Sequence, residues 1–247
     1  MNNIELEKLI DQKLAVETFK DYAPNGLQVE GGPEVKRIVT GVTASQKLLD
    51  AALAHQADSI IVHHGYFWKN EPAAVRGMKR NRLKTLLVND INLYGYHLPL
   101  DAHPELGNNA QLAKLLGINV LGEIMPLVPY GELPNPMPAE AFHQRIEQQL
   151  GKKVLHSAEG GPQEIRRVAW CTGGGQGFIQ QAADFGVDAF ITGEVSEQTI
   201  HIAREMGLHF FAAGHHASER YGVKALGEWL AAEHGLDVTF IDIDNPA

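Results

Sequence analysis

The sequence predicts an α/β protein made of two related α/β halves, with mostly parallel strands and helical crossovers. Short β-branched or aromatic runs alternate with helical patterns, which is typical of parallel strands joined by helices. Residues 39–62 and 168–192 also align with one gap, because both read strand, small-residue turn, helix, Asp, strand. This agreement favours an internal duplication, although repeated α/β units also resemble one another for generic reasons.

Individual strands are expected at the short runs rich in β-branched or aromatic residues: 37–42, 58–62, 92–96, 167–171, 188–192, 209–213 and 237–243. Further strands are expected within residues 120–128 and 153–156. Five prolines between residues 125 and 138 indicate a connector. We therefore expect an N-terminal half over residues 1–125, a Pro-rich connector with a short helix and strand over 126–164, and a C-terminal half over 165–247. The halves should pack as one globular unit.

The composition restricts the class of protein and the chemistry of any metal site. With 247 residues, 44% of them hydrophobic, the chain can bury a large core. No apolar run approaches the ~20 residues of a membrane helix, and the N-terminus is acidic rather than a basic leader. These features predict a soluble, cytoplasmic protein. The single cysteine, Cys171, excludes an internal disulfide framework and a thiolate zinc cage, and its apolar strand predicts a small buried residue.

The net charge of -9 argues against a broad electrostatic surface for nucleic acid. The basic run over residues 76–82 is the exception. We interpret it as a solvated helix start, with phosphate contact as the alternative.

Two adjacent histidines, His63 and His64, follow the strand expected at residues 58–62 and precede Gly65. Ligands of α/β proteins gather at the carboxyl ends of strands. Because successive strand residues point to opposite faces, both imidazoles can serve one site only if the chain bends, and Gly65 permits such a bend. The alternative is one structural and one solvent-exposed histidine.

Each half also offers a histidine followed four residues later by a carboxylate: His97 and Asp101 in the first, His215 and Glu219 in the second. If one helix includes His215 and Glu219, this spacing brings both side chains to one face. Pro99 makes a regular helix between His97 and Asp101 unexpected, so these two are expected to converge through a loop. Imidazole and carboxylate ligands suit zinc, manganese, iron, nickel or cobalt, and the set is large enough for two ions bridged by a carboxylate.

Several motifs in the same order resemble the GTP cyclohydrolase 1 type 2 family, also called the NIF-three-like family, in its short bacterial form without an inserted middle domain. The resemblance covers nearly the whole chain. It rests on five segments: Ala-Pro-Asn25-Gly26-Leu-Gln-Val, Ile-Val-His63-His64-Gly65, Leu-Pro-Leu-Asp101-Ala-His-Pro before Gly107-Asn-Asn-Ala110, Ile-Thr-Gly193-Glu194, and Gly214-His215-His216-Ala-Ser-Glu219.

The resemblance implies two divalent metal ions per subunit in a cleft between the halves, and dimers assembled into a homohexamer. The metal ligands that it implies are His63, His64, Asp101, His215 and Glu219, with Glu219 as the bridge. His97 is placed beside the metals, where it orients a ligand or the substrate.

The activity that the resemblance implies needs an acid or base and a nucleotide pocket besides the metals. The leading acid or base candidates are His97 and Glu194, with His103 and His216 also nearby. Residues 172–177 follow a strand and open a helix, so their amides could receive an anion, but a plain tight turn is the preferred interpretation. Tyr66, Phe67 and Trp68 either stack on a base, cover the site or pack at a subunit interface.

Four further histidines, His55, His143, His156 and His234, lack convergent partners in the sequence pattern and are interpreted as surface or packing residues. Two functions remain open. The leading hypothesis is a metal-dependent hydrolase acting on a nucleotide-like substrate through metal-activated water. The alternative is a non-catalytic metal-binding or metal-handling protein that forms a ring scaffold and interacts with partners. Nucleic-acid binding through the ring surface has only the basic run in its support.

Overall fold

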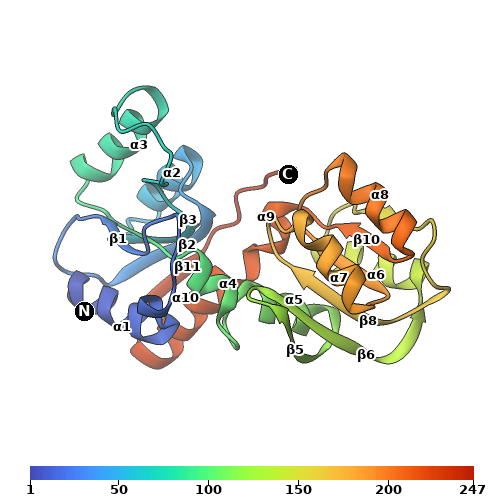
Figure 1. Ribbon diagram of the computed structural model, residues 1–247. Helices are drawn as coiled ribbons and strands as arrows, with labels where there is room; N and C mark the ends of the chain where they lie inside the picture. Colours follow the sequence, from blue (N-terminus) through green and yellow to red (C-terminus); the bar gives the residue numbers. More distant parts are fainter. The chain divides into compact units, whose positions relative to one another are not determined.

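The computed structural model describes all 247 residues, which divide into two compact units (Figure 1). The first unit comprises residues 1–107 and 222–243, and the second comprises residues 108–221 and 244–247. The boundaries expected at residues 125/126 and 164/165 do not coincide with this division. The reason is strand pairing: β11 (Asp237–Phe240) joins the first unit's sheet beside β2 (Arg37–Thr43), so the C-terminal segment returns to that unit.

A five-stranded sheet in the order β1-β4-β3-β2-β11 forms the centre of the first unit. β1 pairs antiparallel with β4, and the other neighbours are parallel. The other strands and the helices of this unit are β1 (Gly26–Val29), β3 (Ser59–His64), β4 (Asn92–Gly95), α1 (Asn3–Leu14), a 3-10 turn at Val16–Thr18, α2 (Gln46–Ala54), α3 (Gly77–Val88), α4 (Leu98–Ala102) and α10 (Arg220–His234), of which residues from 222 onward belong here.

Helices cover both faces of this sheet. Ile61 packs on one face with α1 and α10, in a cluster that contains Leu6 and Leu226. Ile60 packs on the other face with α2 and α3 through Leu48 and Leu86. Adjacent strand residues therefore enter different cores, as the two-residue period of a strand requires.

The second unit contains a six-stranded sheet in the order β5-β6-β8-β9-β10-β7. The central pairs β8–β9 and β9–β10 are parallel, and the remaining three pairs are antiparallel. The elements are α5 (Asn108–Leu116), β5 (Asn119–Met125), β6 (Val128–Pro138), α6 (Ala139–Leu150), β7 (Leu155–Ser157), β8 (Glu164–Cys171), a 3-10 turn at Gln176–Phe178, α7 (Ile179–Phe185), β9 (Ala189–Thr192), α8 (Glu197–Met206), β10 (His209–Ala212) and α9 (His215–Ser218).

Neighbouring residues of β8 enter different cores here as well. Trp170 packs against the face covered by α5 and α6, in a cluster with Phe142 and Phe211. Ala169 packs against the face covered by α7 and α8, in a cluster with Ile179 and Ala203. Both units are therefore three-layered, with helices on either side of a sheet.

The two units share one detail of their parallel strands. Asp58 accepts hydrogen bonds from the amides of Lys36 and Arg37 through Oδ2, and Asp188 accepts the equivalent pair from Arg166 and Arg167. Each aspartate stands directly before the second strand of its β-α-β unit. The aligned aspartates thus perform the same local task, which is to tie the start of one parallel strand to its neighbour.

The Pro-rich segment is a strand and not a connector. β6 pairs with β5 on one side and with β8 on the other. Pro134 and Pro136 fall in the register shift between Glu132 and Met137, where the ladder to β8 is interrupted. Because proline cannot donate to a ladder, this interruption is what lets the strand contain them.

Two further expectations concern the basic run and membrane-spanning helices. The basic run over residues 76–82 forms the start of α3 and is largely exposed, as interpreted from the sequence. None of the helices has the length and apolar character needed to cross a membrane.

Candidate metal centre

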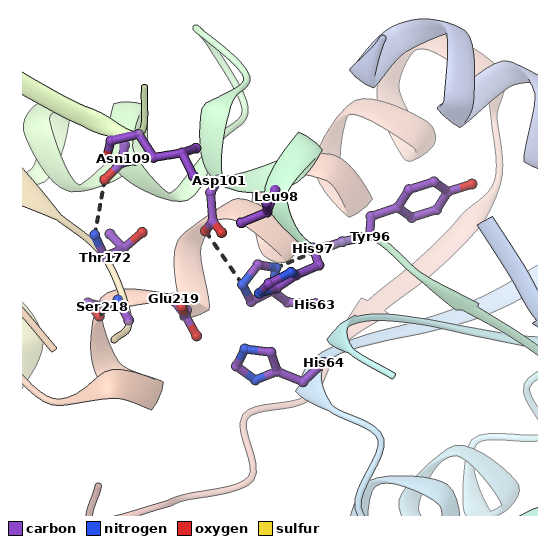
Figure 2. A network of polar contacts seen from close by, with 12 residues as sticks. His63, His64, Tyr96, His97, Leu98, Asp101, Asn109, Thr172, Ser218 and Glu219 are labelled. Carbon is purple, nitrogen blue, oxygen red and sulfur yellow. Dashed lines mark hydrogen bonds and ion pairs between the residues drawn. The ribbon is translucent and has the colours of Figure 1, made fainter. Parts of the chain in front are cut away.

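His63 and His64 end β3 of the first unit, and their ring centroids are 4.5 Å apart (Figure 2). His63 is buried, and its Nδ1 lies 2.9 Å from the carbonyl oxygen of Tyr96. Since a carbonyl only accepts, Nδ1 carries the proton and Nε2 holds the lone pair that a metal needs. Nδ1 of His64 contacts the Thr43 hydroxyl at 3.2 Å.

The missing side chain of Gly65 makes room for Gln28, and the φ of Gly65 is not positive. A Cβ on Gly65 would overlap the side chain of Gln28, which accepts a hydrogen bond from the Tyr66 amide. The missing side chain therefore makes room for packing behind the histidines.

His97 is held by a carboxylate that sequence reasoning did not identify. Its Nδ1 donates to Asp21 Oδ1 at 2.9 Å, and its backbone amide donates to Asn25. Burial raises the pKa of Asp21, but hydrogen bonds from His97, Asn25 and the Ala23 amide outweigh that effect and hold the pKa well below its usual range. A carboxylate on the far nitrogen orients an imidazole and raises its basicity, as in many metal sites.

Asp101 lies on α4, and Pro99 does not prevent that helix, contrary to expectation. The amide of Asp101 donates to the carbonyl of His97, and His97 is the residue that caps the helix start. Pro99 occupies the first turn, where no helical partner is needed for an amide. Asp101 Oδ1 consequently lies 3.5 Å from Nε2 of His63, as the dashed line in Figure 2 shows.

The first unit thus gathers four ligand side chains of suitable chemistry. His63, His64 and His97 can each offer one nitrogen, and these nitrogens lie within 4.8 Å of one another. The Asp101 carboxylate is beside His63. Neutral imidazole and carboxylate suit a divalent transition metal, so these residues fit such an ion.

The three aromatic residues after the histidines have separate roles. Tyr66 is buried and donates its hydroxyl hydrogen bond to the Ala44 carbonyl, so it belongs to the core. Trp68 contacts His97 edge-on, with centroids 5.0 Å apart, and lies 5.8 Å from His64. Phe67 is partly exposed, with Lys79 over its ring. Trp68 therefore flanks the imidazole group, whereas Tyr66 does not.

In the second unit His215 lies between two carboxylates. Its Nδ1 is 2.7 Å from Glu194 and its Nε2 is 3.1 Å from Glu219. Burial lowers the pKa of His215, but hydrogen bonds and charge from Glu219 and then Glu194 outweigh it and raise the pKa to about 9. Glu194, the expected acid or base, is thus placed as the partner that orients His215.

The four-residue spacing of His215 and Glu219 brings their side chains together, but not within a single regular helix. α9 ends at Ser218, Glu219 is its C-cap, and α10 begins at Arg220. The expected position of Glu219, in the first turn of a helix starting near Ala217, therefore shifts to the junction between two helices.

The Gly-rich turn over residues 172–177 is a packing turn. The amides of Thr172, Gly173 and Gly175 donate to side-chain oxygens of Asn109, Ser218 and Thr192, respectively. Figure 2 shows the first of these bonds. Amides already bonded within the protein are not available to an anion, which agrees with the preferred interpretation of a tight turn.

Position 173 in this turn requires glycine, because the turn passes close to Glu219. Its φ is +68°, and an added Cβ would overlap the carboxylate of Glu219. The glycine run is therefore a sequence signal for a close approach to Glu219, although its spacing first suggests phosphate binding.

The two further acid or base candidates are His103 and His216. Nδ1 of His103 accepts hydrogen bonds from the backbone amides of Glu105 and Leu106, so this nitrogen fixes the turn after α4. Burial lowers the pKa of His103. His216 is buried, and its amide donates to the carbonyl of Ala247.

The fold and the candidate ligands together define a class of α/β protein. In both units, histidines and carboxylates that could bind a metal follow the parallel strands. The chain belongs to the Duf34/NIF3 (NGG1p interacting factor 3) family, whose model matches residues 1–246. This finding confirms the resemblance seen in the sequence motifs.

Relatives and solved structures agree with this assignment. A Yersinia pestis protein named GTP cyclohydrolase 1 type 2 homolog is 73% identical over the full length of both chains, and one of the same name from Escherichia coli K12 is 69% identical, again over both full lengths. The solved structure of protein ybgI, described as of unknown function, is 69% identical with a TM-score of 0.99 and complete coverage of both chains. Protein TTHA1606 from Thermus thermophilus is 36% identical, also with complete coverage of both, and has a TM-score of 0.93.

Proposed function

We propose that this protein is a dinuclear metal-dependent hydrolase acting on a nucleotide-like substrate. The observation that carries the proposal is the imidazole group of the first unit, where Nδ1 of His63 donates to the Tyr96 carbonyl and Nδ1 of His97 donates to Asp21, so that Nε2 is the nitrogen that each ring can offer to a metal. Bound divalent ions would acidify a water molecule and so supply a nucleophile at neutral pH.

The proposed ligands are His63, His64, Asp101, His215 and Glu219. The first unit contributes neutral imidazoles and one carboxylate, and the second contributes Glu219 and an imidazole that must lose a proton to bind a metal. Zinc, manganese, iron and nickel all accept such mixed ligands. We propose that both ligand groups are needed to bind the two ions.

His97 is the proposed acid or base. Asp21 fixes the proton on Nδ1, so Nε2 is the nitrogen that can take or return a proton. Glu194 is proposed to act through His215, whose Nδ1 it contacts, rather than on the substrate.

The substrate class is proposed from chemistry and from the relatives' name. Trp68 and Tyr22 contact His97 edge-on at 5.0 Å each, so aromatic faces suited to stacking on a base flank the proposed acid or base. The name GTP cyclohydrolase 1 type 2 homolog makes GTP the first substrate to test.

The test combines metal content with turnover. Metal-free protein is loaded separately with zinc, manganese, iron and nickel, and each form is incubated with GTP and other nucleotides while products are followed by mass spectrometry. We expect turnover that requires metal and is lost in the Asp101→Asn variant. His55→Ala is the matched control, because His55 is an exposed histidine at the end of α2.

The outcomes separate the hydrolase from the alternative. Bound metal without any turnover that depends on Asp101 would overturn the hydrolase and leave a metal-handling or scaffold protein. Loss of one ion in a His63 variant and of only the other in a Glu219 variant would contradict the joint use of both ligand groups.

A further inference from the structure

The second unit contains another histidine cluster, remote in sequence from the proposed ligands. His143 on α6 and His156 on β7 have ring centroids 5.0 Å apart. Glu140, one turn before His143, completes a set whose ligand atoms, one from each residue, lie within 4.8 Å of one another. The sequence pattern alone suggested surface or packing histidines here, because it does not bring α6 beside β7.

The hydrogen bonds of His143 determine which of its nitrogens is available. Nε2 lies 2.9 Å from the carbonyl oxygen of Val154, so this nitrogen donates its proton. Nε2 also lies 3.7 Å from Oε1 of Glu147. Nδ1 is then the nitrogen that can act as a ligand, and it lies 3.8 Å from Oε2 of Glu140.

Two hydrogen bonds in series determine which nitrogen of His156 is available. His209 is buried, and its Nε2 donates to the carbonyl of Pro162 at 2.7 Å, so its Nδ1 can only accept. Nε2 of His156 lies 3.0 Å from that acceptor and must therefore donate. The lone pair of neutral His156 is consequently on Nδ1.

The ring of His156 is also held in position by packing. It stacks on Phe211 with a centroid distance of 4.3 Å and an interplanar angle of 17°. Its orientation is therefore fixed by Phe211 as well as by the hydrogen bond to His209.

We propose that Glu140, His143 and His156 form a second, separate binding site for a divalent transition metal. Two oriented imidazoles and one carboxylate are ligands for zinc, cobalt, nickel or copper(II). Backbone carbonyls and His209 supply the outer hydrogen bonds that orient ligand imidazoles in metal sites. Since Glu140 is exposed, the ion would retain positions open to solvent, and it would fasten the edge strand β7 to α6.

The test measures zinc binding by the full-length protein. Metal-free wild type, Glu140→Gln and His156→Gln are dialysed against the same low free zinc concentration, and bound zinc is counted by mass spectrometry. We expect each variant to bind one equivalent less than the wild type, or to bind it at least about 10-fold more weakly. Glu140→Gln is the safer variant for folding, since its side chain is exposed.

The control is the exposed pair Glu197 and His201 on α8, a carboxylate and an imidazole in contact at i,i+4, whereas Glu140 and His143 are spaced i,i+3; no group of three candidate ligands includes the control pair. Glu197→Gln should bind as much zinc as the wild type. Crystals grown with zinc should show an anomalous peak among Glu140, His143 and His156.

The same measurement in a His63→Ala background separates this site from the proposed hydrolase centre. The decrease caused by Glu140→Gln should persist there. Equal zinc binding by wild type, Glu140→Gln and His156→Gln, with no anomalous peak at the cluster, would overturn the second site without affecting the hydrolase proposal.

Discussion

The two ligand groups follow equivalent strands of the repeated units, yet their side chains are prepared differently. In the first unit a backbone carbonyl accepts a hydrogen bond from Nδ1 of His63, and the Asp21 carboxylate accepts one from Nδ1 of His97. In the second unit both nitrogens of His215 face carboxylates, which raises its pKa to about 9. The comparison shows that two β-α-β units of the same order can orient imidazoles in one case and form a histidine–carboxylate ion pair in the other.

The largest expected effect comes from removing the imidazole that is already oriented. His63→Ala should weaken zinc binding by more than about 100-fold, because loss of an outer partner alone typically costs 10- to 100-fold. Competition with a chromogenic chelator measures this change. His55→Ala should bind zinc as the wild type does. Comparable zinc affinity in His63→Ala and wild type would break the comparison, since the first unit would then contribute no essential ligand.

Gly173→Ala tests the packing of the second group without altering a ligand. The left-handed backbone at φ +68° and the overlap with Glu219 should lower the free energy of unfolding by about 2–3 kcal/mol. Urea unfolding of chelator-treated protein measures the change. Gly177→Ala is the matched control in the same turn, because an added Cβ there meets nothing within 4 Å and its φ is not positive. Similar losses in both variants would contradict a specific approach to Glu219.

Asp21→Asn tests the support of the first group. Removing the charged acceptor of His97 should lower the free energy of unfolding at pH 7 by about 2 kcal/mol. Because the pKa of Asp21 is lowered on folding, its contribution is present above the usual value of 3.8 and is lost as the pH falls through and below that value. Urea unfolding across this range should show wild type and variant converging.

Asp184→Asn provides the control for that titration. Asp184 is exposed and accepts a hydrogen bond from Gln180, one turn earlier in α7. Its replacement should change stability little at any pH. A difference between wild type and Asp21→Asn that does not shrink on acidification would contradict the role given to the charged carboxylate.

Glu194→Gln should have the smallest effect. The amide keeps an acceptor near Nδ1 of His215 but removes the charge, so zinc affinity should fall by about 10-fold with little change in folding stability. The same chelator competition measures it, and Glu197→Gln, on the nearby α8, is the control. A larger loss than in His63→Ala would reverse the order of importance of the two groups.

Strand ends, turns and ligand types could be predicted from the sequence because they depend on local patterns. The duplicated β-α-β order appears in the structure with matching contacts of Asp58 and Asp188. His63, His64 and His215 could be identified as candidates because ligands collect where parallel strands end. Local rules were less reliable where two of them competed. Pro99 predicts no regular helix, but it stands in the first turn of α4, where proline is tolerated. The prolines of β6 predict a connector, but a register shift in the strand contains Pro134 and Pro136.

By itself, the sequence determined the α/β class, the repeated unit and the nitrogen and oxygen chemistry of the candidate ligands. Only the tertiary structure decided how the imidazoles are oriented, because their partners come from distant segments: Asp21 is 76 residues from His97, and His209 is 53 residues from His156. Periodicity reports which face a residue occupies, but not what lies opposite it. The tautomers, and with them the nitrogens offered to a metal, follow from those long-range contacts.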